Sequence, residues 1–234
     1  NEEAFDFYAD NSLSAALNWV YAPDNHSDRI EYLLFFPTNR FKTALPDFEE
    51  GIPIYYDYLA GEFNGSTSQT LSFYYAPPGC LRLLDPEVER VNRLIPENSL
   101  MRYAARLTNP KLIQEEPRAV IPDVYGPEPE HGFCYYYQKA DLARQFGAWD
   151  RVAEFGDLAL SFEDHPYEPA EQLLFIEGYA HAGQWERALE LSERAYEVSP
   201  EVMGRVLCQL SERIGAETGE SPERSEAFTK VQSM

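Results

Sequence analysis

The chain has 234 residues, 44% of them hydrophobic, and carries 40 acidic against 19 basic residues for a net charge of −21. This length is long for one domain and short for two large ones, and the apolar content can fill a core. The negative charge repels phosphate backbones and anionic lipid headgroups, which argues against nucleic acid as a partner. The sequence holds no run of 18 apolar residues, so we expect no direct membrane insertion by this segment.

The first 36 residues are predicted to form one helix and one strand. The capping run 10–12 precedes Leu13 and two alanines, a pattern typical of a short helix. Farther on, the run 30–36 is mostly apolar, partly aromatic and followed by Pro37, which indicates a buried strand.

Residues 52–76 are predicted to form a β-hairpin. The dipeptide Asn64-Gly65 separates two aromatic-rich runs, and Asn-Gly is a strong hairpin signal because both residues adopt positive φ readily. Part of the first run is not strand-like, so a helix through 54–62 is the alternative.

Prolines organise the middle of the chain. Asp85 and Pro86 predict a helix over 86–94, since aspartate caps a helix and proline suits its first turn. A second helix is expected from 96 to 107. Five prolines between 110 and 129 argue against regular structure and predict a linker or an extended strap.

From residue 131 onward the pattern is helical. Gly147 and Gly183 fall where tight turns would join two helices, and Pro166 and Pro200 mark helix ends because proline cannot continue a helix. After Gly215 the chain is polar, which predicts a mobile or weakly helical tail. Helices are expected over 133–146, 149–162, 168–181, 185–198 and 201–214. The expected divisions are a small α/β domain (1–109), a proline-rich strap (110–130), a helical domain (131–215) and a polar tail (216–234).

An internal repeat with a spacing of 36 residues lies in this helical part. The stretch 146–154 (FGAWDRVAE) reappears as 182–190 (AGQWERALE), and Ala159 matches Ala195 at the same offset. Repeats of this length are the signature of stacked architectures, which usually make binding surfaces.

The repeated residues resemble the tetratricopeptide-repeat family, in which small and large side chains alternate so that two antiparallel helices pack closely. Val152 replaces the usual alanine, and Ile176 stands at the small position of a first helix, where Gly178 would supply the gap instead. The matching positions are Gly147, Trp149, Ala159 and Ala140 in the first copy, and Gly183, Trp185, Ala188, Ala195 and Pro200 in the second.

The resemblance covers about residues 133–200 and implies two helical hairpins, with 201–214 as a capping helix. Three or more hairpins are normally needed to bury one another's faces, and two are few. We therefore expect the N-terminal part, through 86–108 and the proline strap, to cover the first hairpin in one compact body. The expected fold class is α+β, a small α/β part with a hairpin packed on the helical repeat pair.

The resemblance also implies a binding face. The family usually holds ligands on the concave face made by the first helices, and positions i, i+4 and i+7 or i+8 share such a face. Arg144 and Tyr137 could hold a peptide that ends in a carboxylate. The alternative is that these residues only contact the N-terminal segment. The binding residues expected are Tyr137, Asp141 and Arg144 in one copy, and Leu173, Glu177 and His181 in the other.

Catalytic and metal-binding motifs are missing from the sequence. The four histidines form no HExxH pair, and neither a phosphate-binding glycine loop nor a GxSxG elbow occurs. Cys80, Cys134 and Cys208 have no zinc-site spacing. One disulfide with a leftover thiol and three isolated buried thiols both remain open. We therefore expect no enzymatic activity, no cofactor and no metal.

Two functions remain open at this point. The first is a non-catalytic protein-interaction or accessory domain that binds a protein or peptide on the concave face. The second is an extracytoplasmic carbohydrate-binding or accessory domain, because the Tyr and Phe clusters could stack on sugars. Residues 30–84, with the motif 77–82 (PPGCLR), resemble soluble tails of bacterial polytopic membrane proteins of glycosyltransferase type. A start at Asn1 without Met also leads us to expect a piece of a longer protein, which leaves the compartment open.

Overall fold

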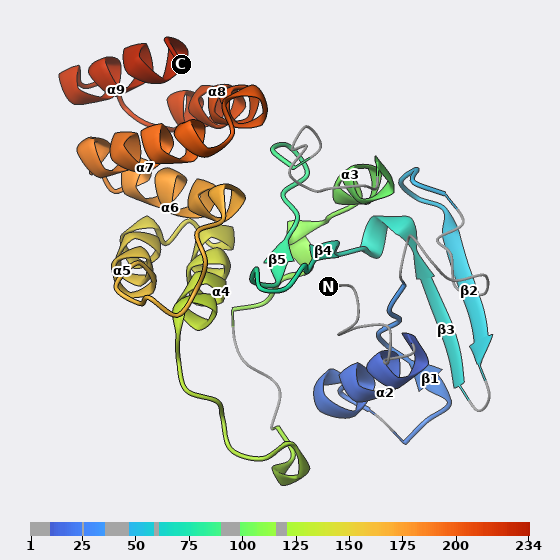
Figure 1. Ribbon diagram of the computed structural model, residues 1–234. Coiled ribbons are helices and arrows are strands. Elements are labelled where there is room, and N and C mark those ends of the chain that lie inside the picture. The colour runs from blue at the N-terminus through green and yellow to red at the C-terminus, as the bar shows by residue number, and fades with distance from the viewer. Residues whose placement is uncertain (1–9, 25, 36–46, 59–60, 90–98, 116–120) are drawn as a thin grey trace. The chain divides into compact units, whose positions relative to one another are not determined.

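The protein combines α-helices with two small β-sheets (Figure 1). The computed structural model describes residues 10–24, 26–35, 47–58, 61–89, 99–115 and 121–234. The chain forms two compact units, 1–72 with 98–130 and 73–97 with 131–234. The units do not follow the linear division expected from the prolines, because residues 73–97 belong with the C-terminal helices.

The first unit opens with the expected helix, α2 (Asp10–Tyr21). Its side chains bind the backbone of the run that follows: Asn18 Oδ1 accepts from the N–H groups of Glu31 (2.8 Å) and Tyr32 (3.0 Å), and Ser14 Oγ accepts from Leu34 (2.9 Å). Side-chain bonds of this kind replace the ladder of a sheet. The strand β1 therefore covers only Arg29–Ile30, and the strand predicted through residue 35 is wrong, while residue 36 lies outside the described part.

A β-hairpin is present, but its turn is not at Asn64-Gly65. Strand β2 (Pro53–Tyr58) pairs antiparallel with β3 (Gly61–Ser66), and β1 pairs parallel with β3 on its other edge. Asn64 and Gly65 lie inside β3, opposite Tyr55 and Ile54. The helix considered for 54–62 is likewise wrong over the strand residues.

Close packing at Gly61 explains the shift of register. A Cβ at Gly61 would lie 2.8 Å from the Ile30 side chain and 3.3 Å from the carbonyl oxygen of Asp28, so only glycine lets β1 approach here. The local preference of Asn-Gly for a turn gives way to this longer-range contact. Residues 59 and 60, which separate the two strands in sequence, lie outside the described part.

In its described parts, the middle of the chain contains less helix than the two helices predicted there. Residues 86–89 form one turn capped by Asp85, and the rest of the helix expected over 86–94 lies outside the described residues. Helix α3 covers Ser99–Ala105, within the helix expected from 96 to 107. In the described parts of the proline-rich region, regular structure is limited to two 3₁₀ turns, η2 (Pro110–Leu112) and η3 (Asp123–Tyr125).

The second unit is a stack of helices in chain order, drawn from yellow-green to red in Figure 1. All five expected helices form, and Gly147 and Gly183 take the positive φ of tight turns, 64° and 75°. A two-stranded sheet, β4 (Phe73–Tyr74) with β5 (Arg82–Leu83), belongs to the same unit. The helices are α4 (Phe133–Gln145), α5 (Trp149–Ala159), α6 (Pro169–His181), α7 (Trp185–Val198), α8 (Pro200–Glu217) and α9 (Pro222–Gln232).

The end of the chain forms a packed helix where a mobile or weakly helical tail was expected. Ser221 caps α9 by accepting a hydrogen bond from the Arg224 N–H at 3.1 Å. The ring of Phe228 meets the ring of Trp185 edge to face, with centroids 5.7 Å apart. The short apolar stripe of α9 thus closes the stack over α7, which a polar composition does not reveal.

Small residues set the spacing between neighbouring helices. Ala159 and Ala195, the repeated positions, are both fully buried. In the first copy the larger Val152 of α5 is accommodated by Gly178 of α6, where a Cβ would lie 2.3 Å from Val152 Cγ1. The absence of a side chain at Gly178 therefore makes room for the larger side chain of Val152.

We predict that Gly178→Ala destabilises the protein by about 1–3 kcal/mol because the added methyl overpacks against Val152. Adding Val152→Ala should recover most of the loss, since the smaller side chain reopens the space. Urea denaturation of the two single variants and the double variant measures the coupling. Gly219→Ala, where a Cβ meets open space, is the control. Simple additivity of the two changes would contradict this packing account.

Candidate functional site

Five of the six predicted binding residues line one pocket in the helical unit. Tyr137, Asp141 and Arg144 reach it from α4, and Leu173 and Glu177 reach it from α6. The remaining wall is formed by Leu83, Asp85, Val88 and Glu89, by Ala170 and Leu174 of α6, and by Leu210 and Arg213 of α8. Five of the residues expected to share a face therefore lie around one pocket.

The centre of this site is a cluster of buried charges. Asp85 Oδ2 accepts hydrogen bonds from Arg144 Nη1 at 2.8 Å and from Arg213 Nη1 at 2.6 Å. Glu177 lies 2.8 Å from Arg213 Nη2 and 3.5 Å from Arg144 Nη1, and Asp141 accepts from Arg144 Nη2 at 3.2 Å. None of the five side chains is more than 16% exposed. We call these five residues the charge cluster.

The two central carboxyls of the charge cluster have opposite pKa shifts. Burial raises the pKa of Asp85, but attraction to Arg144 and Arg213 outweighs it and leaves that pKa far below its ordinary value. Burial also raises the pKa of Glu177, and here the same two arginines do not fully offset it. Asp85 is therefore the firmly ionised acid of the cluster, and Glu177 is the more readily protonated one.

The chain's own segment occupies the predicted binding face. Asp85 Oδ1 accepts from the N–H groups of Glu87 (2.8 Å) and Val88 (3.1 Å), which fixes the turn over 86–89. Leu84 is fully buried and Val88 is 4% exposed in the core. Arg144 therefore contacts a segment from the N-terminal half of the chain.

Only some of the residues that were expected to cover the first hairpin lie in the helical unit. The described residues 73–89 belong to the helical unit, but residues 98–130, which include the proline strap, belong to the other unit. Residues 73–89 are therefore the described part of the N-terminal half that packs with these helices.

His181 is the predicted residue that does not line this pocket. Its ring stacks on Trp149, with centroids 3.9 Å apart, and its Nε2 lies 3.3 Å from Glu217 Oε2. Burial lowers the pKa of His181 against the opposing effect of Glu217. The helix rotation places it toward α5 and the end of α8.

Asp85 and Arg213 are central residues that the sequence analysis did not place in the site. Asp85 was interpreted only as a helix cap. Arg213 follows Val206 and Leu210 by seven and three positions, so it lies on the buried face of α8. A lone arginine on an apolar helical face is the signal that was available.

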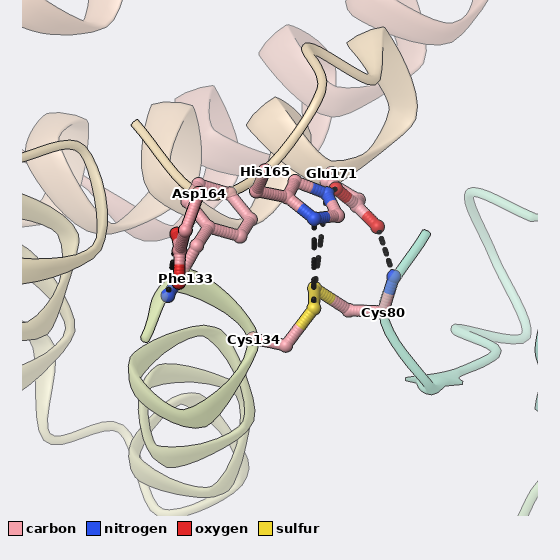
Figure 2. Close-up of a disulfide and its surroundings, with 6 residues drawn as sticks. All are labelled: Cys80, Phe133, Cys134, Asp164, His165 and Glu171. Atoms are coloured by element: carbon pink, nitrogen blue, oxygen red, sulfur yellow. Dashed lines mark hydrogen bonds and ion pairs between the residues drawn. A yellow bond between two sulfur atoms is a disulfide. The ribbon is translucent and has the colours of Figure 1, made fainter. Parts of the chain in front are cut away.

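A second cluster surrounds a disulfide between Cys80 and Cys134 (Figure 2). The bond resolves the cysteine alternatives in favour of one disulfide and a free thiol, Cys208, which is exposed. His165 Nδ1 lies 3.7 Å from Cys134 Sγ, and His165 Nε2 lies 2.6 Å from Glu171 Oε2. The other oxygen of Glu171 accepts from the Cys80 N–H at 2.7 Å. The disulfide thus anchors the segment five residues before Asp85.

Metal ligands are grouped in two places within the described chain. Cys80 and Cys134 lie beside His165, but their sulfurs are joined in the disulfide and offer no thiolate. Glu177 and His181 lie near Glu217, but Glu177 already neutralises arginines of the charge cluster. We assign no metal to either group.

Comparisons of the chain with protein-family models, curated proteins and solved structures find no match. None of the helices in the described parts combines the length and the apolar character that a bilayer span requires. The function is therefore inferred from the chemistry of the two clusters and of the exposed surface.

We predict that Asp85→Asn lowers the free energy of unfolding by about 3 kcal/mol at pH 7, because it leaves Arg144 and Arg213 short of a partner. Because the pKa of Asp85 is lower in the folded protein than in the unfolded chain, Asp85 stabilises the folded state at pH values above its unfolded pKa of about 3.9. This stabilisation is lost as the pH falls toward the folded pKa. The gap between wild type and variant should therefore narrow from pH 5 to pH 2. Urea titrations across this range measure it, with Glu190→Gln on the exposed side of α7 as the control. If the difference in the free energy of unfolding between wild type and Asp85→Asn did not change with pH, the lowered pKa of Asp85 would be refuted.

Proposed function

We propose that this chain is a non-catalytic protein-interaction or accessory domain, whose tetratricopeptide-like helices recognise an extended, carboxylate-bearing protein segment. The observation that carries the proposal is Asp85 seated between Arg144 and Arg213. A segment with apolar side chains on either side of an acid, extended up to Asp85 and turning over 86–89, is thereby held against α4, α6 and α8. Two guanidinium groups facing one carboxylate are typical of acidic-motif recognition.

The built-in occupant determines how a partner would bind. A partner segment must compete with residues 82–89, which are tethered to the face at an effective concentration of the order of millimolar. Only molecules in which the face is open can bind the partner, so the apparent affinity is weaker when this fraction is smaller. A partner with one strong acid and flanking aliphatic side chains satisfies the same contacts as the intramolecular segment.

The disulfide supports a location outside a reducing compartment. Disulfides persist in secreted, periplasmic and cell-surface proteins and are rare in the cytosol. An extracytoplasmic accessory domain fits both the disulfide and the large negative charge, which favours solubility.

The proposal is tested with a fluorescent peptide of residues 81–89, titrated into wild type and into Asp85→Ala. Removing the internal acid weakens the internal segment, so the variant should bind the peptide at least tenfold more tightly, a change of about 1.4 kcal/mol. Fluorescence anisotropy measures the affinity, and circular dichroism confirms that the variant is folded.

A matched peptide with asparagine in place of the aspartate separates acid recognition from general stickiness. It should bind Asp85→Ala more weakly than the acidic peptide, and Arg213→Gln in the same background should remove the difference. A folded Asp85→Ala variant that binds neither peptide, or both equally, would refute recognition of an acidic segment by this face.

An exposed aromatic pair favours the second candidate, a carbohydrate-binding accessory domain. Trp19 and Tyr125 are 51% and 50% exposed, and their ring centroids lie 5.8 Å apart in the first unit. Such rings offer an apolar face together with polar edges that can hydrogen-bond to sugar hydroxyls. A glycan array probed with wild type and with Tyr125→Ala tests this candidate: wild type should bind and the variant should not. A blank array with folded wild type would remove it.

A further inference from the structure

The disulfide lies against a buried acid–imidazole pair. The side chains of His165 and Glu171 are 7% and 1% exposed. His165 Nδ1 lies 3.7 Å from Cys134 Sγ, and Nε2, which is bound to Glu171, lies 3.9 Å from Cys80 Sγ. Figure 2 shows the ring facing the sulfur pair, with the Glu171 carboxylate beside it. A cross-link with only a structural role needs no ionisable pair at its sulfurs.

We propose that Cys80–Cys134 is an exchangeable redox disulfide that reacts with thiols, with Cys134 as the sulfur attacked and His165 as its positioning and charge-stabilising partner. Cys80 is 2% exposed, whereas Cys134 is only partly buried, so an incoming thiolate reaches Cys134 first. Nothing in this assignment depends on the peptide-binding proposal.

The exchange balances in two steps. A thiolate attacks Cys134 Sγ, a new S–S bond forms there, and the Cys80–Cys134 bond breaks so that Cys80 leaves as a thiolate and takes up a proton. A second thiolate then attacks the incoming sulfur of the mixed disulfide and releases Cys134 as a thiolate. The protein disulfide gains two electrons, and the two thiols lose them by forming their own disulfide.

Three features stabilise the Cys134 thiolate after reduction. Glu171 binds His165 Nε2 and leaves Nδ1 directed at Cys134, so the ring is held where an Nδ1–H group would donate toward the sulfur. Cys134 is the second residue of the 13-residue helix α4, where free backbone N–H groups and the helix dipole favour an anion. The ring of Phe133 stacks on His165 with centroids 4.4 Å apart and holds its orientation.

Other charges near the cluster act on it more weakly. Asp164 accepts from the Phe133 N–H at 3.3 Å, and the buried Arg82 is attracted to Glu171. The first opposes a thiolate at the start of α4, and the second favours it. The same two charges surround the sulfurs in variants of His165, so a comparison with those variants isolates the imidazole.

The first experiment measures the thiol–disulfide equilibrium in glutathione redox buffers. Cys208→Ser is the background, because the exposed Cys208 would react by itself. After rapid alkylation, mass spectrometry gives the reduced fraction. His165→Gln should lower the equilibrium constant for reduction about tenfold, or about 30 mV for this two-electron couple. Glu171→Gln should shift it in the same direction. Unchanged equilibria in both variants would overturn the proposal.

The second experiment maps the attacked sulfur. Oxidised Cys208→Ser protein is treated with reduced glutathione, a monothiol, and with dithiothreitol, a dithiol, and trapped by acid. Glutathione should appear on Cys134 and not on Cys80, while dithiothreitol should carry the reaction to the free dithiol. Mixed disulfide found on Cys80, or no reaction of the folded protein with either thiol, would overturn the assignment.

A kinetic measurement separates a role in chemistry from a role in folding. In the reduced Cys208→Ser protein, the alkylation of Cys134 should reach half its maximal rate below the pH of about 8.5 that is usual for a free thiol. His165→Gln should move this midpoint back toward the usual value. A reduced protein that loses its helical circular dichroism would show that the bond is only structural and would also overturn the proposal.

Discussion

The carboxylate of Asp85 connects parts of the helical unit that are far apart in sequence. Its two arginine partners lie 59 and 128 residues away, on α4 and α8. Buried ions are tolerated only when their partners are close and their hydrogen bonds are satisfied. The two arginines lie close to the acids Asp85, Asp141 and Glu177 only when the segment, α4, α6 and α8 are all in place, and Arg213 Nε is left without a hydrogen-bond partner in the described chain. The charge cluster therefore fixes one arrangement, and its opposite charges limit the cost of burial.

The segment around Asp85 is held on the helices at two points, Cys80 and Asp85. Leu84 lies between these two points and Val88 follows the second, and both side chains are buried. The disulfide holds one end covalently, and the charge cluster holds the other electrostatically. Both attachments therefore act on the same ten residues, 80–89, while helix α9 packs on α7 through Phe228 and Trp185.

Helices α4 to α8 could be predicted because their signals are local: turn glycines, helix-ending prolines and repeated small positions, whereas α9 lies in a polar stretch that predicted no packed helix. The β-hairpin register could not, because Gly61 is required by Ile30, a residue 31 positions earlier, and this contact overrides the turn preference of Asn64-Gly65. Only half of the candidate site could be predicted from the sequence, for the same reason. A shared helical face predicted that Tyr137 and Arg144 lie together, whereas the pairing with Asp85 depends on tertiary structure that no local pattern encodes.

The opposite pKa shifts of Asp85 and Glu177 indicate that the two carboxyls differ in how easily they are protonated. Asp85 stays ionised through mild acid because both arginines hold it, so the segment remains fastened. Glu177 is more easily neutralised, since burial dominates its environment, and its protonation leaves the two arginines facing Asp85 and Asp141 with balanced charge. The acid that fastens the segment is thus separate from the acid that adjusts the charge of the face. A competing ligand would have to replace the first and could tolerate the state of the second.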